Sequence, residues 1–211
     1  MTQRLVLASN NRAKLAELQR LFEPLGLELL GQGALGVPEA DEPHATFLEN
    51  ALAKARHAAT ASGLPALADD SGLCVDALGG QPGVASAHYA EVDLPPDADR
   101  ETRRALQDAA NNRRLLEALQ GVADRRAGFV CTLVALRHAA DPQPLVATGA
   151  WRGEILEAPR GAGGFGYDPL VWIPSLARSV AELDADEKNA LSHRALAVHE
   201  MLARLRALWI A

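Results

Sequence analysis

Apolar runs alternate along this chain with segments in which apolar residues recur at helical spacing. The runs have the length of buried strands and lie at residues 5–8, 27–30, 66–69, 129–136, 145–151 and 170–173. The segments with apolar residues three or four positions apart predict amphipathic helices at residues 12–22, 47–62, 101–119 and 192–208. This alternation predicts an α/β fold. The two long apolar runs after Gly128 predict a hairpin and hence a mixed sheet.

The length and composition of the chain allow a substantial core. Of its 211 residues, 48% are hydrophobic, and neither a repeat nor a long linker interrupts the pattern. We therefore expect a single domain over residues 1–211, built either as one body or as two lobes that share a sheet.

Charge and cysteine content narrow the class of protein. The formal net charge of −6 argues against general nucleic-acid binding, so a polyanionic ligand would need a local cluster of cations. Cys74 and Cys131 lie in apolar, strand-like segments without metal-ligand spacing, which predicts buried free thiols in a reducing compartment. We expect a cytoplasmic protein that does not bind membranes, because the sequence shows neither a signal-like segment nor an apolar run of membrane-spanning length.

Lysine is rare in this chain, and its positions stand out. Of the 21 basic residues only three are lysines, namely Lys14, Lys54 and Lys188. Because arginine supplies the general surface charge, a position kept as lysine suggests a need for a compact, flexible charge, such as one that contacts phosphate oxygens. The alternative is that lysine occurs at these positions by chance.

The first lysine follows a strand, a polar turn and the start of a predicted helix. Ser9-Asn10-Asn11 comes directly after the apolar run at 5–8 and precedes the helical pattern that contains Lys14. Free N–H groups at a helix N-terminus attract anions, and Lys14 would reach the same anion. Serine and asparagine are also ordinary helix caps, and on these residues alone capping is the simpler interpretation.

Two adjacent carboxylates follow the apolar run at 66–69. Asp69-Asp70 leads into Ser71-Gly72, which we interpret as a turn after the end of a strand. Paired acids at a strand end suit Mg²⁺ and the orientation of water. In an extended segment the two side chains point to opposite faces, so we expect one to face the site and the other to support the loop. An acidic turn that caps the next segment is the alternative.

The third informative stretch is rich in glycine and contains an aromatic pair. Four of the six residues Gly161 to Gly166 are glycines, with Phe165 among them and Tyr167 directly after. Glycines allow a backbone to approach a ligand closely, and an aromatic ring among them is a suitable stacking surface for a nucleobase. A flexible hairpin connection would explain the glycines but not the aromatic residues.

Together these motifs resemble those of one family, the inosine/xanthosine triphosphate pyrophosphatases, or Ham1-like proteins. The resemblance runs from about Leu5 to Leu205, and six motifs occur in the family's order. They are Ser9-Asn10-Asn11 with Lys14, Thr46 to Ala51 with Lys54, Ala68 to Leu73, Leu78 to Gly83, Gly164 to Pro169, and Glu187 to Arg194. The chain departs from the family at its first motif, where Thr-Gly-Asn is the commoner form.

The resemblance implies both a fold and an activity. The implied fold is an elongated mixed β-sheet flanked by helices, with two lobes and a central substrate cleft. The implied activity is hydrolysis of ITP, dITP and XTP to the monophosphate and pyrophosphate, with Mg²⁺ as cofactor, which would remove these nucleotides from the precursor pool. The family resemblance also implies a homodimer.

The family's site residues carry over to matching positions. Asp70 would be the general base and a metal ligand, and the second metal-binding acid would come from the loop with Glu39, Asp41 and Glu42, with Asp41 or Glu42 favoured. Direct attack by water requires no covalent nucleophile. Thr46 and Glu49 also form a capping box, which we favour as their role. The substrate-binding residues would be Ser9, Asn10, Asn11, Arg12, Ala13, Lys14, Lys54, Ser71, Phe165, Gly166, Tyr167, Asp168, Lys188, His193 and Arg194.

Two alternative functions stay open at this point. One is a nucleotide pyrophosphatase of the Maf type with another base preference. The other is a nucleotide-binding protein without catalytic activity. A substrate panel separates the first from the favoured reading, and a pyrophosphate-release assay separates the second.

Overall fold

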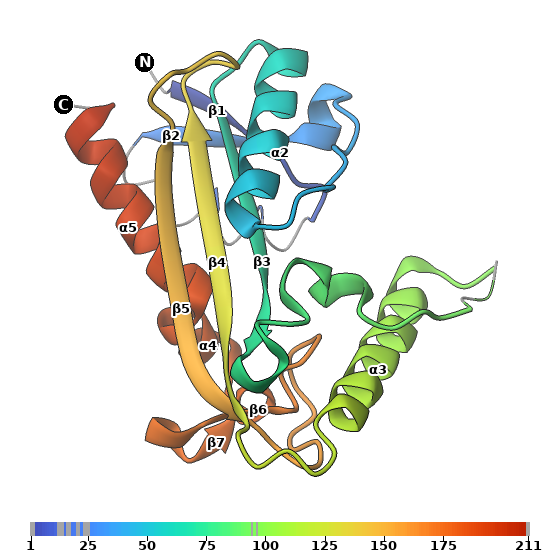
Figure 1. Ribbon diagram of the computed structural model, residues 1–211. Helices are drawn as coiled ribbons and strands as arrows, with labels where there is room; N and C mark the ends of the chain where they lie inside the picture. The colour runs from blue at the N-terminus through green and yellow to red at the C-terminus, as the bar shows by residue number, and fades with distance from the viewer. Residues whose placement is uncertain are drawn as a thin grey trace. The chain divides into compact units, whose positions relative to one another are not determined.

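The computed structural model describes residues 3–11, 15, 18–19, 22, 26–93, 95 and 97–209. The strands are β1 (Gln3–Leu7), β2 (Leu27–Gly31), β3 (Ala66–Val75), β4 (Arg126–Leu136), β5 (Leu145–Ile155), β6 (Val171–Ile173) and β7 (Arg178–Ser179) (Figure 1). The α-helices are α2 (Phe47–Ser62), α3 (Arg100–Ala118), α4 (Ala185–Leu191) and α5 (His193–Leu208). The predicted helix at 12–22 falls mostly outside the described residues.

The strands form one mixed sheet, as predicted. Their order is β2-β1-β3-β4-β5-β6-β7. β1 pairs in parallel with β2 and β3, whereas β6 pairs antiparallel with β5 and β7. β4 and β5 are neighbours that run in opposite directions, which confirms the predicted hairpin (Figure 1).

The chain divides into two compact units. Unit 1 is formed within residues 1–71, 131–149 and 193–211, and unit 2 within residues 72–130 and 150–192. β3, β4 and β5 each contribute residues to both units. The two units and the three strands that contribute to both agree with the expectation of two lobes that share a sheet. The central cleft and the assignment of residues 1–211 as a single domain stay predictions.

In unit 1, alternate residues of the strands pack against different helices. Leu5 and Leu7 of β1 and Leu67 of β3 lie in a cluster with the apolar residues of α5. The intervening residues Val6 and Ala66 lie in a second cluster, with the alanines of α2. Because successive side chains of a strand point to opposite faces, α2 and α5 cover opposite faces of this part of the sheet.

In the core of unit 2, residues of β3 and of the glycine-rich loop pack against the end of α3. Leu73 and Val75 of β3 are buried with Leu115 and Leu119 at the end of α3, and with Tyr167.

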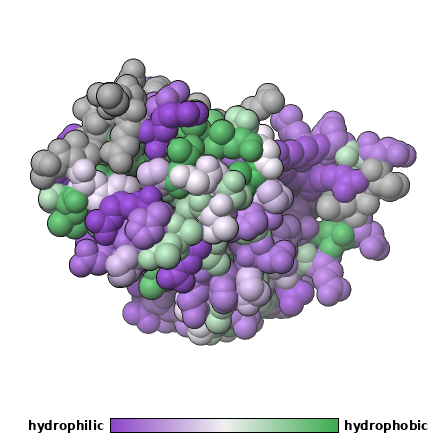
Figure 2. Space-filling view, turned by 90° about the horizontal axis from the view of Figure 1, so that it is seen from above, coloured by the Kyte–Doolittle hydropathy of each residue, from purple (hydrophilic) through white to green (hydrophobic). Residues whose placement is uncertain are grey.

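The molecular surface seen from above is mostly hydrophilic, with apolar residues in small groups between polar ones (Figure 2).

Helix starts follow local capping chemistry. Thr46 caps α2: its hydroxyl accepts a hydrogen bond from the Glu49 N–H at 3.2 Å and donates one to the Glu49 carboxylate at 2.7 Å. Thr46 is therefore the helix cap that the motif predicts, whereas the Glu49 carboxylate bonds the Thr46 hydroxyl and not the Thr46 N–H that a full capping box requires. Asp184 and Glu187 form a full capping box at α4, because the Glu187 carboxylate accepts a hydrogen bond from the Asp184 N–H and the Asp184 carboxylate accepts one from the Glu187 N–H. This box was not predicted.

The prediction that a strand ends before a Ser71-Gly72 turn is wrong. β3 continues through Asp69, Asp70 and both of these residues to Val75. The physical reason is that Leu73 and Val75 enter the core of unit 2, which keeps the chain extended past its polar residues. The predicted helix at 192–208 also begins differently, because Ser192 is extended and separates α4 from α5.

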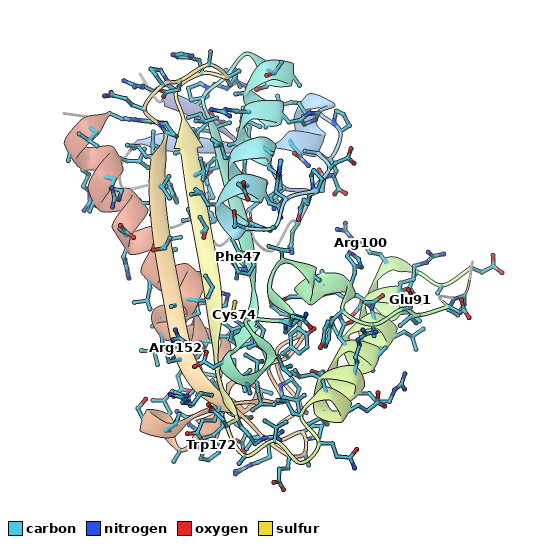
Figure 3. All side chains as sticks on the ribbon, in the orientation of Figure 1. Phe47, Cys74, Glu91, Arg100, Arg152 and Trp172 are labelled. Atoms are coloured by element: carbon cyan, nitrogen blue, oxygen red, sulfur yellow. The ribbon has the colours of Figure 1, made fainter. Side chains whose placement is uncertain are left out.

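Two predictions concern cysteines and membranes. Cys131 is buried, as predicted, whereas Cys74 on β3 is partly exposed (Figure 3). Both cysteines lie in the described part of the chain, and no disulfide joins them. None of the helices built by the described residues is long and apolar enough to span a membrane.

Candidate active site

Asp70 lies on β3 and forms the centre of a cluster of charged groups in unit 1. Residue 70 points to the same face of the strand as Ala66 and Ala68, which is the face covered by α2. Lys54 of α2 places its Nζ 3.0 Å from Asp70 Oδ1 and 3.0 Å from Glu42 Oε1. One ammonium group therefore bridges the strand carboxylate and an acid of the loop before α2.

Burial and charge tune both members of this pair. Burial raises the pKa of the Asp70 carboxyl above its ordinary value, and the positive charge of Lys54 only partly offsets this rise. For Lys54, burial alone would lower the pKa, but the negative charges of Asp70, Asp69 and Glu42 outweigh burial and raise it. Lys54 therefore stays protonated beside a carboxylate with increased affinity for protons.

Asp69 has separate partners on the opposite face of β3. Its Oδ2 lies 3.9 Å from Nη2 of Arg194 and accepts a hydrogen bond from the Ser71 hydroxyl at 3.3 Å. The expectation that the two neighbouring carboxylates point to opposite faces is confirmed. The structure thus groups Asp70 with Lys54 and Glu42, and groups Ser71 and Arg194 with Asp69.

The loop that carries the predicted metal-binding acids is held by side chains of α2. Asn50 is buried, accepts a hydrogen bond from the His44 N–H at 3.0 Å and donates one to the His44 carbonyl at 3.3 Å. His57 bonds through Nε2 to the Pro38 carbonyl at 3.0 Å. Sequence reasoning missed this role of Asn50, although a polar residue on the alanine-rich face of a helix is a usable signal.

The three candidate acids of this loop are placed differently. Glu42 reaches Lys54 next to Asp70, whereas Glu39 Oε1 accepts a hydrogen bond from Asn10 Nδ2 at 2.9 Å. Asp41 is exposed. Among the described residues, no three His, Cys, Asp or Glu side chains form a group that could hold a metal ion.

The turn after β1 is only partly described. Ser9 accepts a hydrogen bond from the Asn11 N–H at 3.2 Å, which is the local bond expected of a serine in a turn. Asn10 is directed towards Glu39. The predicted phosphate contacts at Arg12, Ala13 and Lys14 lie outside the described residues.

His193 and Arg194 begin α5, and a glycine allows that helix end to approach β5. A Cβ atom at Gly149 would lie 2.0 Å from the His193 carbonyl oxygen and 2.6 Å from the Ala197 nitrogen. Glu200 further anchors the helix by accepting a hydrogen bond from the Thr148 N–H at 2.8 Å. This close packing fixes the position of both predicted site residues, which are buried.

The glycine-rich loop of unit 2 exposes one aromatic ring and buries the other. Phe165 is 48% exposed, while Tyr167 is 4% exposed and its hydroxyl donates a hydrogen bond to the Ser86 carbonyl at 3.0 Å. Burial raises the pKa of Tyr167 above its ordinary value. Any contact of Tyr167 with a substrate would therefore come from its backbone.

Hydrogen bonds from side chains fix the backbone of Phe165 and Gly166. Asp168 accepts a hydrogen bond from the Phe165 N–H at 2.8 Å and also pairs with Lys188 of α4. Asp108 accepts a hydrogen bond from the Gly166 N–H at 2.8 Å, and Asn112 donates one to the Gly166 carbonyl at 2.8 Å. The two α3 residues were missed from the sequence because they are separated from the loop by more than fifty positions.

Comparison with known proteins identifies the family of this chain. The Ham1 family model matches residues 5–204. A protein of Methylibium petroleiphilum named dITP/XTP pyrophosphatase is 69% identical over 208 residues, which are 99% of this chain and all of that protein. A protein of the same name from Leptothrix cholodnii is 68% identical over 209 residues, 98% of each chain.

Solved structures give the same result for the fold. The structure of a HAM1 protein from Coxiella burnetii has a TM-score of 0.87 at 44% identity and covers 97% of this chain and 99% of that one. The Staphylococcus aureus Ham1 protein has a TM-score of 0.84 at 34% identity over the same shares. With a family match over nearly its whole length and relatives this similar, the chain belongs to the Ham1 family.

Proposed function

We propose that this chain hydrolyses the deaminated purine nucleotides ITP, dITP and XTP to the monophosphate and pyrophosphate, and so removes them from the nucleotide pool. The proposal is supported by membership of the Ham1 family and by the curated relatives named dITP/XTP pyrophosphatase. The observation that carries the chemistry is the buried Asp70 carboxylate, whose pKa is raised and which is paired with Lys54.

Asp70 is the general base of the proposed reaction. A water molecule attacks the α-phosphorus, the bond from this phosphorus to the bridging oxygen breaks, and pyrophosphate leaves with that oxygen. The proton of the attacking water passes to Asp70, whose raised pKa increases its affinity for that proton. The Lys54 ammonium stabilises negative charge that develops next to it.

A divalent metal fits the same group of residues, and we propose Mg²⁺. Asp70 Oδ2 is buried and accepts no hydrogen bond from a described residue, and its Oδ1 already shares a cation with Glu42. Mg²⁺ commonly binds through one or two carboxylates together with phosphate oxygens and water. Asp70 and Glu42 would hold the ion, which would neutralise charge on the phosphates. Asp41, also favoured from the sequence, is the second candidate.

The remaining predicted residues would bind the two ends of the nucleotide. The turn at Ser9, Asn10 and Asn11 would hold phosphates together with residues 12–14, and Lys54 would contribute a charge. Phe165 would stack on the base, since its ring is exposed on a backbone that is fixed by hydrogen bonds. Lys188, Asp168 and the backbone of Gly166 and Tyr167 would complete that part. Ser71, His193 and Arg194 would contact the substrate from the Asp69 side of β3.

We further propose that the protein acts as a cytoplasmic homodimer. Support for this state comes from the family resemblance found in the sequence. Of the alternative functions, the Maf type does not agree with the Ham1 family match. A nucleotide-binding protein without catalytic activity is the alternative that an assay addresses directly.

The test is a time course with ITP and Mg²⁺, in which early products are separated by chromatography. We expect IMP and pyrophosphate to appear together from the first time point, and the reaction to stop when the metal is chelated. ATP should be hydrolysed much more slowly. Early IDP and orthophosphate would contradict cleavage between the α and β phosphates, and equal rates with ATP and ITP would contradict the proposed role in the nucleotide pool.

A further inference from the structure

The exposed ring of Phe165 has a second cation over it, Arg104, which none of the motifs contains. Arg104 lies on α3, one turn after Arg100, which marks the beginning of that helix in Figure 3. The central carbon of its guanidinium is 4.4 Å from the centroid of the Phe165 ring. Lys188 Nζ is 4.3 Å from the same centroid. Both distances are within the range of cation–π contacts.

Three residues on one face of α3 contact the loop that carries Phe165. Arg104, Asp108 and Asn112 are spaced four residues apart and therefore lie on one side of the helix. Asp108 and Asn112 bind the two backbone groups of Gly166, while Arg104 contacts the ring of the preceding residue. The guanidinium is thus held next to the exposed ring by the register of the helix.

The charges around the ring are unequally exposed. Asp168 is 3% exposed and binds the Phe165 N–H, and Asp108 binds the Gly166 N–H, so both carboxylates are directed at the loop backbone. The side chain of Arg104 is 50% exposed, and its contact with Asp108 is long at 4.0 Å. A group that stacks on Phe165 would therefore meet positive charge that is more accessible than the negative charge that balances it.

We infer that Arg104 is a specificity residue that favours purine bases bearing negative charge, and xanthine above hypoxanthine. This inference rests on the proposed function, in which Phe165 stacks on the base. Xanthine loses a ring proton more readily than hypoxanthine and is largely an anion near neutral pH. Hypoxanthine is largely neutral at that pH, and adenine has no acidic ring N–H. A cation beside the stacked ring stabilises the xanthine anion and has little effect on a neutral base.

The test compares kcat/KM for XTP and ITP in the wild type, Arg104→Gln and Arg104→Lys. Removal of the charge in Arg104→Gln should lower the XTP to ITP ratio by about threefold or more, the scale of one partly screened charge near the base. Arg104→Lys keeps the charge and should keep most of the ratio. Raising the salt concentration should shrink the difference between wild type and Arg104→Gln, since screening acts on the exposed charge.

Arg114→Gln is the matched control. Arg114 lies on the same helix, and its guanidinium is 4.9 Å from the ring of Tyr89, a different aromatic residue. Its substitution removes the same charge from the same helix and should leave the ratio unchanged. Calorimetric titration with XMP and IMP gives a second readout, in which Arg104→Gln should weaken XMP binding more than IMP binding.

The outcomes separate this inference from the proposed function. If Arg104→Gln lowers kcat/KM for XTP and ITP by the same factor, or if Arg104→Lys is as impaired as Arg104→Gln, Arg104 only supports the ring and the inference is wrong. If wild-type protein hydrolyses neither XTP nor ITP, the proposed function itself fails. A wild type that is active on both, with an XTP preference lost in Arg104→Gln alone, supports both.

Discussion

At the scale of single residues, the neighbouring carboxylates on β3 show how position on a strand assigns chemistry. Asp69 and Asp70 are identical in type and adjacent in sequence, yet one lies near Arg194 of α5 and the other bonds Lys54 of α2. The separation follows from the alternation of side chains along an extended strand. A substitution at each position should therefore have a distinct effect.

Asp70→Asn should lower kcat by at least about 10²-fold with little change in folding, because the amide keeps the size of the side chain but cannot accept the proton of the attacking water. Steady-state kinetics with ITP measures the loss, and circular dichroism checks the fold. Asp69→Asn is the control and should retain much more activity. The reverse result, with turnover lost in Asp69→Asn and kept in Asp70→Asn, would mean that the two roles are exchanged.

A second residue-scale prediction concerns stability and pH. The buried Asp141 carboxylate accepts hydrogen bonds from the Arg137 N–H and guanidinium and from the Gln143 N–H, each at 2.9 Å. The hydrogen bonds with Arg137 hold the pKa of Asp141 far below its ordinary value. The unfolded chain therefore binds the proton first, and this contribution to stability is complete at neutral pH and is lost as the pH falls below about 4.

Asp141→Asn should destabilise the protein by about 2 kcal/mol at pH 7, and the difference from wild type should shrink towards pH 3. Urea denaturation at both pH values measures it. The control is Asp124→Asn, which removes an exposed carboxylate 2.6 Å from Arg126 and should change stability little. A difference that grows as the pH falls would contradict the assigned cause.

At the scale of elements, the start of α5 depends on its contact with β5. The backbone of Gly149 approaches the first turn of the helix so closely that no side chain fits between them. His193 and Arg194 occupy that turn. The packing of Gly149, which has no side chain, therefore determines where these two predicted site residues lie.

Gly149→Ala should destabilise the protein by about 1–3 kcal/mol, the usual effect of overpacking, and should also lower kcat/KM for ITP by displacing His193 and Arg194. Thermal unfolding and steady-state kinetics together measure the two effects. Gly153→Ala is the matched control on the same strand, because its Cβ would crowd the Trp172 carbonyl instead. It should lower stability with a smaller effect on kcat/KM. Equal losses of activity in the two variants would argue against a local effect at α5.

At the scale of the whole molecule, the proposed homodimer is a property of the assembled protein. Light scattering at micromolar concentration should give a mass of about 45 kDa, twice the 22.4 kDa of one chain. A mass that stays at that of one chain over the concentrations used in the activity assay would rule out the dimer as the active form.

Local patterns in the sequence determined much of this protein. The apolar periods predict the strands β1 to β6 and the helices α2, α3 and α5 because they reflect which face of each element is buried, and the Thr46 cap of α2 depends on neighbouring residues alone. Helix α4 was not predicted. The motifs around Lys54, Asp70 and Phe165 also identify the family. The two-residue strand β7 is too short to produce a pattern.

The tertiary structure decided where these local features end and which of them meet. β3 extends past Asp70 because Leu73 and Val75 are buried by α3, which no local signal reveals. Lys54 joins Asp70 to Glu42, and α3 holds the Phe165 loop, because folding brings together residues that are far apart along the chain. Such contacts depend on sheet order and helix packing, which leave no local pattern in the sequence.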